Sequence, residues 1–344
     1  MSQVMSSLER VVTAVQLKEA DRVPVIPIVM LRALRTIGAD AREALGNGQI
    51  MAEAKIRAHG LFGGDGVLAG TGLLVEAENL GCTCEYFERS LPVVIEPALK
   101  SKEQLANLPP FSPERGRAKA VADETAILAK HFGNRLVLGA PVSGPLTTAG
   151  ALFGSEDLLL SLFDDPEFVR RLLGVATEAI KAYASVLMQS GAAAIAVLDP
   201  MATADVIPPR IYTELIQPYH QEILAFIKDK GHVPILHICT NTEPIWEQMA
   251  QAGPFALSGD LPNIGECKKR VGGQVCLMGN VSPYRTMAFG TPDDVFNEAK
   301  EVIRQAGRGG GLILTPGCDL DYEVPDENII ALVEAAKQSP YPLS

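Results

Sequence analysis

Basic residues, aromatic residues and long apolar runs are all scarce in this chain of 344 residues. Lysine and arginine total 30 against 41 aspartates and glutamates, which gives a formal net charge of −11. Nucleic-acid and anionic-membrane binding both need basic patches, so this balance argues against them and is typical of a cytoplasmic enzyme. Every apolar run stops well short of the roughly 18 residues of a membrane span, and residues 1–10 lack the pattern of a signal peptide.

Cysteine is also sparse, with six residues in the chain and no Cys-x-x-Cys pair. Six cysteines are too few for a disulfide scaffold, and a reducing cytoplasm keeps thiols free. The chain has neither the Gly-x-Gly-x-x-Gly turn of dinucleotide-binding folds nor the Gly-x-x-x-x-Gly-Lys-Ser/Thr loop of P-loop proteins. Nucleotide cofactors are therefore not expected, and the useful question is which cysteines could bind a metal.

The chain does contain a regular alternation of short apolar segments and amphipathic segments. The apolar segments are hydrophobic throughout, as parallel strands covered on both faces should be, and helical patterns follow most of them. We predict strands over residues 23–29, 66–70, 135–140, 192–198, 233–239, 255–259, 275–279 and 311–315. Helices are predicted over residues 3–18, 49–59, 113–132, 155–163, 165–190, 208–230, 243–252, 264–271, 291–306 and 325–337.

Eight such strands without an intervening linker favour one closed (β/α)8 barrel, a TIM barrel, over an open doubly wound sheet. We expect this α/β domain to span residues 1–344 as a single unit. Two segments fall outside the repeat. An N-terminal helical segment precedes the first strand, and the alternating residues 81–98, with a turn-like Arg-Ser pair, predict a β-hairpin excursion.

The strand over residues 233–239 ends in a His-x-Cys pair. Residues two apart point to the same face of a strand, so His237 and Cys239 can reach one ion. Cys318 follows the last strand, and the C-terminal ends of all barrel strands meet at one mouth. Three N and S ligands with an open fourth position are the pattern of a catalytic zinc site, whereas structural zinc has four protein ligands. For each residue alone, a satisfied histidine or a free cysteine is the alternative.

Other polar residues are predicted at the same strand ends. Asp199 and Asn280 are the candidates for a catalytic role beside the turn at residues 141–145, and Asp260 lies on a neighbouring strand end. Capping of the following helix is the alternative for both aspartates. We assign the remaining cysteines and histidines to core, surface or supporting positions: Cys82, Cys84, Cys267, Cys276, His59, His131, His220 and His232.

The chain resembles the uroporphyrinogen decarboxylase superfamily nearly from end to end, and within it the methylcobamide:coenzyme M methyltransferases. The segments that carry the resemblance are Leu198-Asp199-Pro200, Leu236-His237-Ile238-Cys239-Thr240-Asn241, Met278-Gly279-Asn280-Val281-Ser282 and Thr315-Pro316-Gly317-Cys318. The zinc motif of that family, His-x-Cys with a distant Cys, falls on His237, Cys239 and Cys318.

The resemblance implies a TIM barrel, a Zn²⁺ cofactor and methyl transfer from a methylated corrinoid, carried on a corrinoid protein, to a zinc-activated thiol such as coenzyme M. Arg32 and Arg285, with Arg35, are candidates by position for binding an anionic acceptor. Thr240 replaces the glycine that is usual in the family, and residues 261–266 also differ, so another thiol or tetrahydrofolate is an alternative acceptor.

Two other functions stay open at this point. One is a metal-free decarboxylase, for which residues 30–35 (MLRALR) only partly match the arginine-rich segment of that family, and Thr71-Gly72 stands where its key aspartate is expected. The other is a corrinoid-binding module without catalysis.

Overall fold

Seven parallel strands form the curled sheet at the centre of the molecule. The computed structural model describes residues 4–343. In spatial order the strands are β1 (Gly66–Leu68), β4 (Val137–Ser143), β5 (Ala194–Leu198), β6 (Val233–His237), β7 (Ala256–Ser258), β8 (Cys276–Val281) and β9 (Leu312–Pro316). Each strand pairs in parallel with the next along the chain. This order is that of a TIM barrel, as the sequence predicts.

The first predicted strand, residues 23–29, is the exception. It forms only an isolated parallel bridge from Val25 to Leu314 of β9. Its backbone nevertheless reaches both edges of the sheet, because Ile26 N donates to Leu314 O at 3.0 Å and Asp65 N donates to Val25 O at 2.7 Å. Pro24 and Pro27 remove two backbone donors from this segment. The barrel is therefore closed by a few hydrogen bonds instead of a regular eighth strand.

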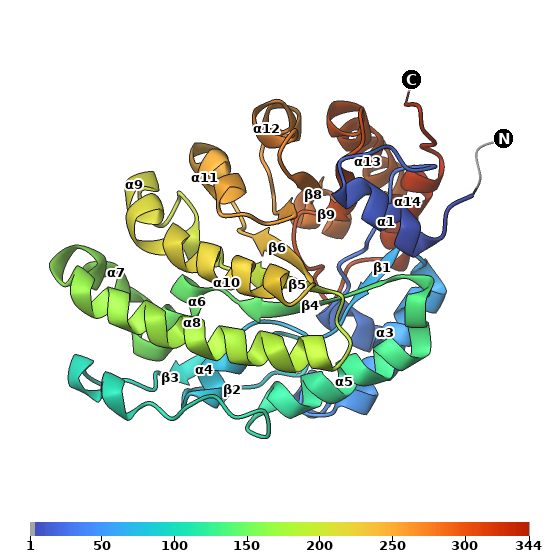
Figure 1. The fold of residues 1–344 in the computed structure, drawn as a ribbon. Coiled ribbons are helices and arrows are strands. Elements are labelled where there is room, and N and C mark those ends of the chain that lie inside the picture. Colours follow the sequence, from blue (N-terminus) through green and yellow to red (C-terminus); the bar gives the residue numbers. More distant parts are fainter. Residues whose placement is uncertain (1–3, 344) are drawn as a thin grey trace.

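Helices cover the outside of the barrel, and the first helix, α1, and the last, α14, lie on the same side of it (Figure 1). The main ones are α3 (Gly48–Phe62), α5 (Arg117–Phe132), α6 (Pro145–Phe153), α7 (Ser155–Asp164), α8 (Pro166–Gln189), α10 (Gln217–Asp229), α11 (Trp246–Gln251), α12 (Ile264–Val271), α13 (Pro292–Ala306) and α14 (Asp326–Lys337). Shorter helices are α2 (Ala41–Ala44), α4 (Val75–Asn79) and α9 (Pro209–Ile211). Among the described residues, no helix is both long and apolar enough to cross a membrane.

Some helices differ from their predicted bounds. The predicted helix 49–59 runs through Gly60 and ends at Gly63, whose φ of 75° is easy for glycine. The helix predicted over 208–230 contains a π-helical turn, Tyr212–Ile216. α6 is absent from the prediction, because nearly all its side chains are buried and leave no amphipathic pattern.

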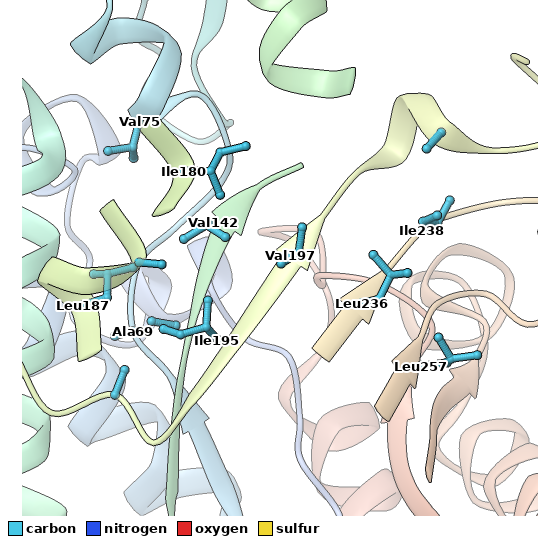
Figure 2. Close-up of a cluster of buried hydrophobic side chains, with 14 of the residues drawn as sticks. Ala69, Val75, Val142, Ile180, Leu187, Ile195, Val197, Leu236, Ile238 and Leu257 are labelled. Carbon is cyan, nitrogen blue, oxygen red and sulfur yellow. The ribbon is translucent and has the colours of Figure 1, made fainter. Parts of the chain in front are cut away.

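Alternation along the strands separates an outer core from the barrel interior. Outward residues of the strands belong to this outer core: Ile195 of β5 lies near Leu187 of α8, and Leu236 of β6 lies beside Ile238 and Leu257 (Figure 2). The intervening residues face inward, and among them are Ala194 and Ala196 of β5 and Ile235 and His237 of β6. The interior therefore receives the small and polar side chains, which leave space there.

Helix α1 (Ser7–Val15) packs against the apolar residues of the barrel interior. Its Val11 and Ala14 are buried in one cluster with Ile26, Cys276 and Ile313. Ser6 and Glu9 form a capping box at its first turn. The predicted helix 3–18 is thus shorter at its C-terminal end, and its predicted start at residue 3 lies outside the described residues.

The predicted hairpin forms from β2 (Thr83–Glu85) and β3 (Val93–Glu96), which pair antiparallel. Leu91 in its connection lines the central cavity, and a Cβ on Gly72 would meet Leu91 Cδ2 at 2.8 Å. The hairpin connection therefore lies against the barrel mouth.

Candidate metal centre

His237, Cys239 and Cys318 converge at the mouth of the barrel. The Nε2 atom of His237 lies 3.0 Å from Cys239 Sγ and 3.8 Å from Cys318 Sγ, and the two sulfur atoms are 3.6 Å apart. A tetrahedral zinc ion at ordinary bond lengths holds such ligand atoms about 3.5–3.8 Å from one another. The donor chemistry fits zinc, and the two distances to Cys318 Sγ fall in this range, whereas the His237–Cys239 distance is about 0.5 Å shorter than the range and would widen around a bound ion. These three residues are the His, Cys, Asp or Glu group in the described chain whose ligand atoms all lie within 4.8 Å of one another.

The three candidate ligands come from the ends of two strands, β6 and β9. His237 is the last residue of β6, and Cys239 follows two residues later, just beyond the end of the strand. Thr240 then turns the chain with a φ of 60°, which is unfavourable for a β-branched residue. Cys318 lies two residues beyond β9, three strands away in the sheet.

Ser258 at the end of β7 holds the ring of His237. Its Oγ lies 3.0 Å from His237 Nδ1, and both side chains are buried. A metal on Nε2 leaves Nδ1 with a proton that can be donated to this hydroxyl, so the contact is compatible with the tautomer that a metal site needs and orients the ring. Sequence reasoning missed Ser258, because only the pairing of His237 with Ser258 across β6 and β7 reveals it.

The two cysteines share their protons unequally. Contact with the Cys239 thiol and with His237 lowers the pKa of Cys318 to about 4. The same sulfur contact, together with burial, raises the pKa of Cys239. The contact therefore favours ionisation of Cys318 over that of Cys239, and two sulfur donors so close together suit a soft cation.

A cavity of about 220 Å³ opens beside these ligands into the barrel. Its walls are almost entirely apolar and include Ile28, Leu68, Ala196 and Met278. All three candidate ligands and Ser258 also line it. A small molecule bound there would therefore touch the metal-binding atoms in a largely water-free space.

Asp319 also lines the cavity, directly after Cys318. Its Oδ1 accepts a hydrogen bond from Met30 N at 2.9 Å. Burial, with Cys318 nearby, raises the pKa of this carboxyl to about 7. Sequence reasoning missed Asp319, although a carboxylate directly after the candidate ligand Cys318 could have been predicted to lie near the metal site.

Asp199 is fully buried and bonded to the start of α6. Its carboxylate accepts from Leu146 N and Thr147 N at 3.2 and 2.7 Å and from Thr147 Oγ1 at 2.6 Å. His220 Nε2 lies 2.9 Å away, so this histidine is a buried partner of Asp199 and not a surface residue. Through these contacts Asp199 holds the start of α6 and the ring of His220 in place. A direct catalytic role of Asp199 stays a prediction.

Asn280, Asp260, Thr240 and Arg285 line a second, polar groove outside the cavity. Asn280 donates to Leu261 O at 2.7 Å, and Arg285 is 80 % exposed and pairs with Glu298 at 3.4 Å. Thr240 Oγ1 lies 2.8 Å from Thr203 Oγ1. These residues therefore ring the metal centre from outside, and contact of Asn280 or Arg285 with a substrate stays a prediction.

Arg32 is buried away from the cavity. It donates to Val324 O at 2.8 Å and pairs with Asp326. Arg35 lies 3.3 Å from Glu323, on the surface. Neither arginine lines the cavity, so a bound acceptor in this space would not reach them without rearrangement.

The remaining cysteines and histidines lie outside the centre. Cys267 and Cys276 are buried in the core, as predicted, and Cys82 is buried with its thiol donating to Ala151 O. The rings of His59 and His232 contact the backbone carbonyls of Gly64 and Ala192.

Comparison with known proteins finds both methyltransferases and uroporphyrinogen decarboxylases among the relatives, and a decarboxylase of Prochlorococcus marinus is 27% identical over 314 residues, which cover 89% of this chain and 87% of its own. The family model described as uroporphyrinogen decarboxylase (URO-D) matches residues 6–339. The methylcobamide:CoM methyltransferase MtbA of Methanosarcina acetivorans is 28% identical over 338 residues, which cover 97% of this chain and 98% of MtbA. MtaA of Methanosarcina barkeri, a methylcobamide:CoM methyltransferase, is 29% identical over 333 residues, with 95% and 96% covered. A solved structure, a methyltransferase from Methanosarcina mazei, superposes with a TM-score of 0.89 at 28% identity and covers 97% of this chain and 99% of its own.

Proposed function

The chain belongs to the uroporphyrinogen decarboxylase (URO-D) family, and we propose that it is a methyltransferase that moves a methyl group from a methylated corrinoid to a small thiol at a zinc site. The observation that carries this proposal is the convergence of His237 Nε2 with the sulfurs of Cys239 and Cys318 at an apolar cavity. The names of the methylcobamide:CoM methyltransferase relatives support the same reaction class.

The reaction moves a methyl group without its bonding electron pair. The carbon–cobalt bond breaks, both electrons stay on the corrinoid, and cobalt changes from Co(III) to Co(I). A carbon–sulfur bond forms at the acceptor, whose thiol proton goes to solvent. Zinc held by His237, Cys239 and Cys318 would keep the acceptor as a thiolate near neutral pH, and the thiolate is the nucleophile.

The residues of the chain supply orientation and a dry site. Ser258 holds the ring of His237 through Nδ1, and this orientation presents Nε2 toward the two sulfurs. The apolar walls exclude water from the acceptor sulfur, so the sulfur is not shielded by a hydration shell. The open mouth is where a corrinoid protein would present its methyl group.

The alternative of a tetrapyrrole decarboxylase is less well supported. A porphyrinogen carries many carboxylates and needs cations around it. No lysine or arginine lines the cavity in the described part of the chain, and Gly72 lines it where that family's aspartate is expected. The corrinoid-binding module and the tetrahydrofolate-dependent transferase are separated from the proposal by the assay below.

Metal analysis and turnover test the proposal together. We expect about one zinc per purified chain, because three protein ligands with one open position is the catalytic zinc pattern. With free methylcobalamin under anaerobic conditions, added 2-mercaptoethanol should convert the absorbance of the methylated cofactor to that of Co(I). Cys239→Ala and Cys318→Ala should lose both the zinc and the turnover.

Cys84→Ser is the matched control, since Cys84 lies on β2 in the hairpin, away from the ligands. This variant should keep both the zinc and the turnover. A protein free of zinc, or one that demethylates the cofactor with tetrahydrofolate and with no thiol, would contradict the proposal.

A further inference from the structure

The walls of the cavity beside the metal centre contain no positive charge. Apart from His237, Cys239, Ser258 and Cys318, the one polar side chain that lines it is Asp319. No lysine or arginine contributes to this lining within residues 4–343. The cavity is therefore apolar with a single carboxyl group at its ligand end.

Three cations of the surrounding fold are bonded to other groups. Lys55 donates to the carbonyls of Leu68 and Gly70 at 2.7 and 2.6 Å and pairs with Glu124 at 3.2 Å. Arg32 bonds Val324 O and Asp326, and Arg285 lines the separate polar groove. None of these cations lines the cavity, so none contributes positive charge to its walls.

The metal itself would not supply the missing positive charge. Zn²⁺ with two cysteine thiolates and a neutral imidazole carries no net charge, and an acceptor thiolate makes the site negative. A second anion on the same small acceptor would be buried in apolar surroundings without a partner, which is strongly unfavourable.

Asp319 adds to this preference through the oxygens of its carboxyl group. It follows Cys318 directly and lines the cavity, where its position is held by the bond from Met30 N. Carboxyl oxygens attract cationic groups and hydroxyl or ammonium donors, whereas the oxygens of a sulfonate can only accept hydrogen bonds. The end of the cavity beside the metal ligands is therefore matched to a neutral or positive group.

We infer that this site takes a small thiol whose other groups are neutral or cationic, and that it discriminates against thiols that end in a sulfonate or phosphate. The inference rests on the proposed methyl transfer to a thiol, and it identifies the acceptor class. Coenzyme M, 2-mercaptoethanesulfonate, is thus a poor acceptor for this chain, although relatives are named for it.

Three thiols with the same two-carbon spacing provide the test. Thiocholine ends in a trimethylammonium group, 2-mercaptoethanol in a hydroxyl and coenzyme M in a sulfonate. Calorimetric titration of the zinc-loaded protein without corrinoid should show thiocholine binding at least about tenfold more tightly than coenzyme M, with 2-mercaptoethanol between them, because like charges repel in a desolvated site.

Asp319→Asn tests whether the protein sets the order of affinities, as opposed to a difference in how tightly the three thiols bind zinc by themselves. The amide keeps an oxygen that can accept from Met30 N, so the local structure and the zinc content should persist. Affinity for thiocholine should fall about fivefold or more and affinity for coenzyme M should rise, because the carboxyl of Asp319 can ionise beside a cationic group whereas an amide cannot. Asp321→Asn is the control, since Asp321 is exposed two residues further along and should change neither affinity.

The outcomes distinguish the two proposals. If coenzyme M binds as tightly as thiocholine, or if Asp319→Asn leaves their ratio unchanged, the acceptor inference is overturned, while turnover with coenzyme M would still uphold methyl transfer to a thiol. If the predicted binding order holds but no thiol demethylates methylcobalamin, the charge preference of the cavity for its ligand is upheld, whereas the proposed function fails and the thiols are not acceptors.

Discussion

At the scale of single residues, Ser258 supports the metal centre without being one of its ligands. Its hydroxyl lies 3.0 Å from His237 Nδ1, and loss of such a supporting contact typically weakens metal binding about 10–100-fold. We therefore expect Ser258→Ala to raise the Kd for zinc at least about tenfold. Competition with a chromophoric chelator measures this constant.

Ser185→Ala is the matched control, because its hydroxyl only donates to Lys181 O within α8. That variant should bind zinc like the unmodified chain. Equal zinc affinity in both variants would show that Ser258 has no part in positioning His237.

At the scale of secondary-structure elements, one buried carboxylate joins α1 to the segment that closes the barrel. Asp65, just before β1, is fully buried. It accepts hydrogen bonds from Ser7 Oγ, from Val25 N and from the guanidinium groups of Arg10 and Arg22, all at 2.7–3.0 Å. The few backbone bonds of residues 23–29 therefore depend on this ionic cluster.

We expect Asp65→Asn to destabilise the protein by about 3 kcal/mol or more, because removing one partner leaves buried charge uncompensated. Urea unfolding followed by circular dichroism measures the change. Asp229→Asn, an exposed residue at the end of α10, should shift stability by no more than about 0.5 kcal/mol. Similar unfolding midpoints for the two variants would argue against a role of the cluster in closing the barrel.

At the scale of the whole molecule, the hairpin places apolar residues beside the mouth. Val93 and Ile95 on β3 are 46% and 54% exposed, and residues two apart on a strand share a face. Leu91, two residues before Val93, lines the cavity itself. A corrinoid protein that delivers its methyl group through the mouth would lie next to this hairpin face.

If the proposed function holds, Val93→Glu combined with Ile95→Glu should raise the KM for a methylated corrinoid protein about tenfold, since buried charge at an interface is costly. Turnover of free methylcobalamin should stay unchanged, because the variant does not touch the metal centre. Leu61→Glu, at the end of α3 near the N-terminal ends of the strands, is the control. An unchanged KM for the hairpin variant would place the docking surface elsewhere.

The sequence by itself determined the order of strands and helices and the pairing of His237 with Cys239. Both follow from the spacing of apolar and polar residues within a short segment, which is visible in the sequence without knowledge of the fold. It did not reveal α6, whose side chains are buried on all sides, or the proline-interrupted closure at residues 23–29.

Only the tertiary structure decided what surrounds the three ligands. It brought Ser258 to His237, turned Arg32 away to Asp326, tied Asp199 to α6 and left Asp319 as the charged group of the cavity. These contacts join segments far apart in the chain, and their partners depend on the register and closure of the barrel. That is why the convergence of His237, Cys239 and Cys318 could be predicted from residue type and spacing, whereas the residues that line the cavity beside them could not.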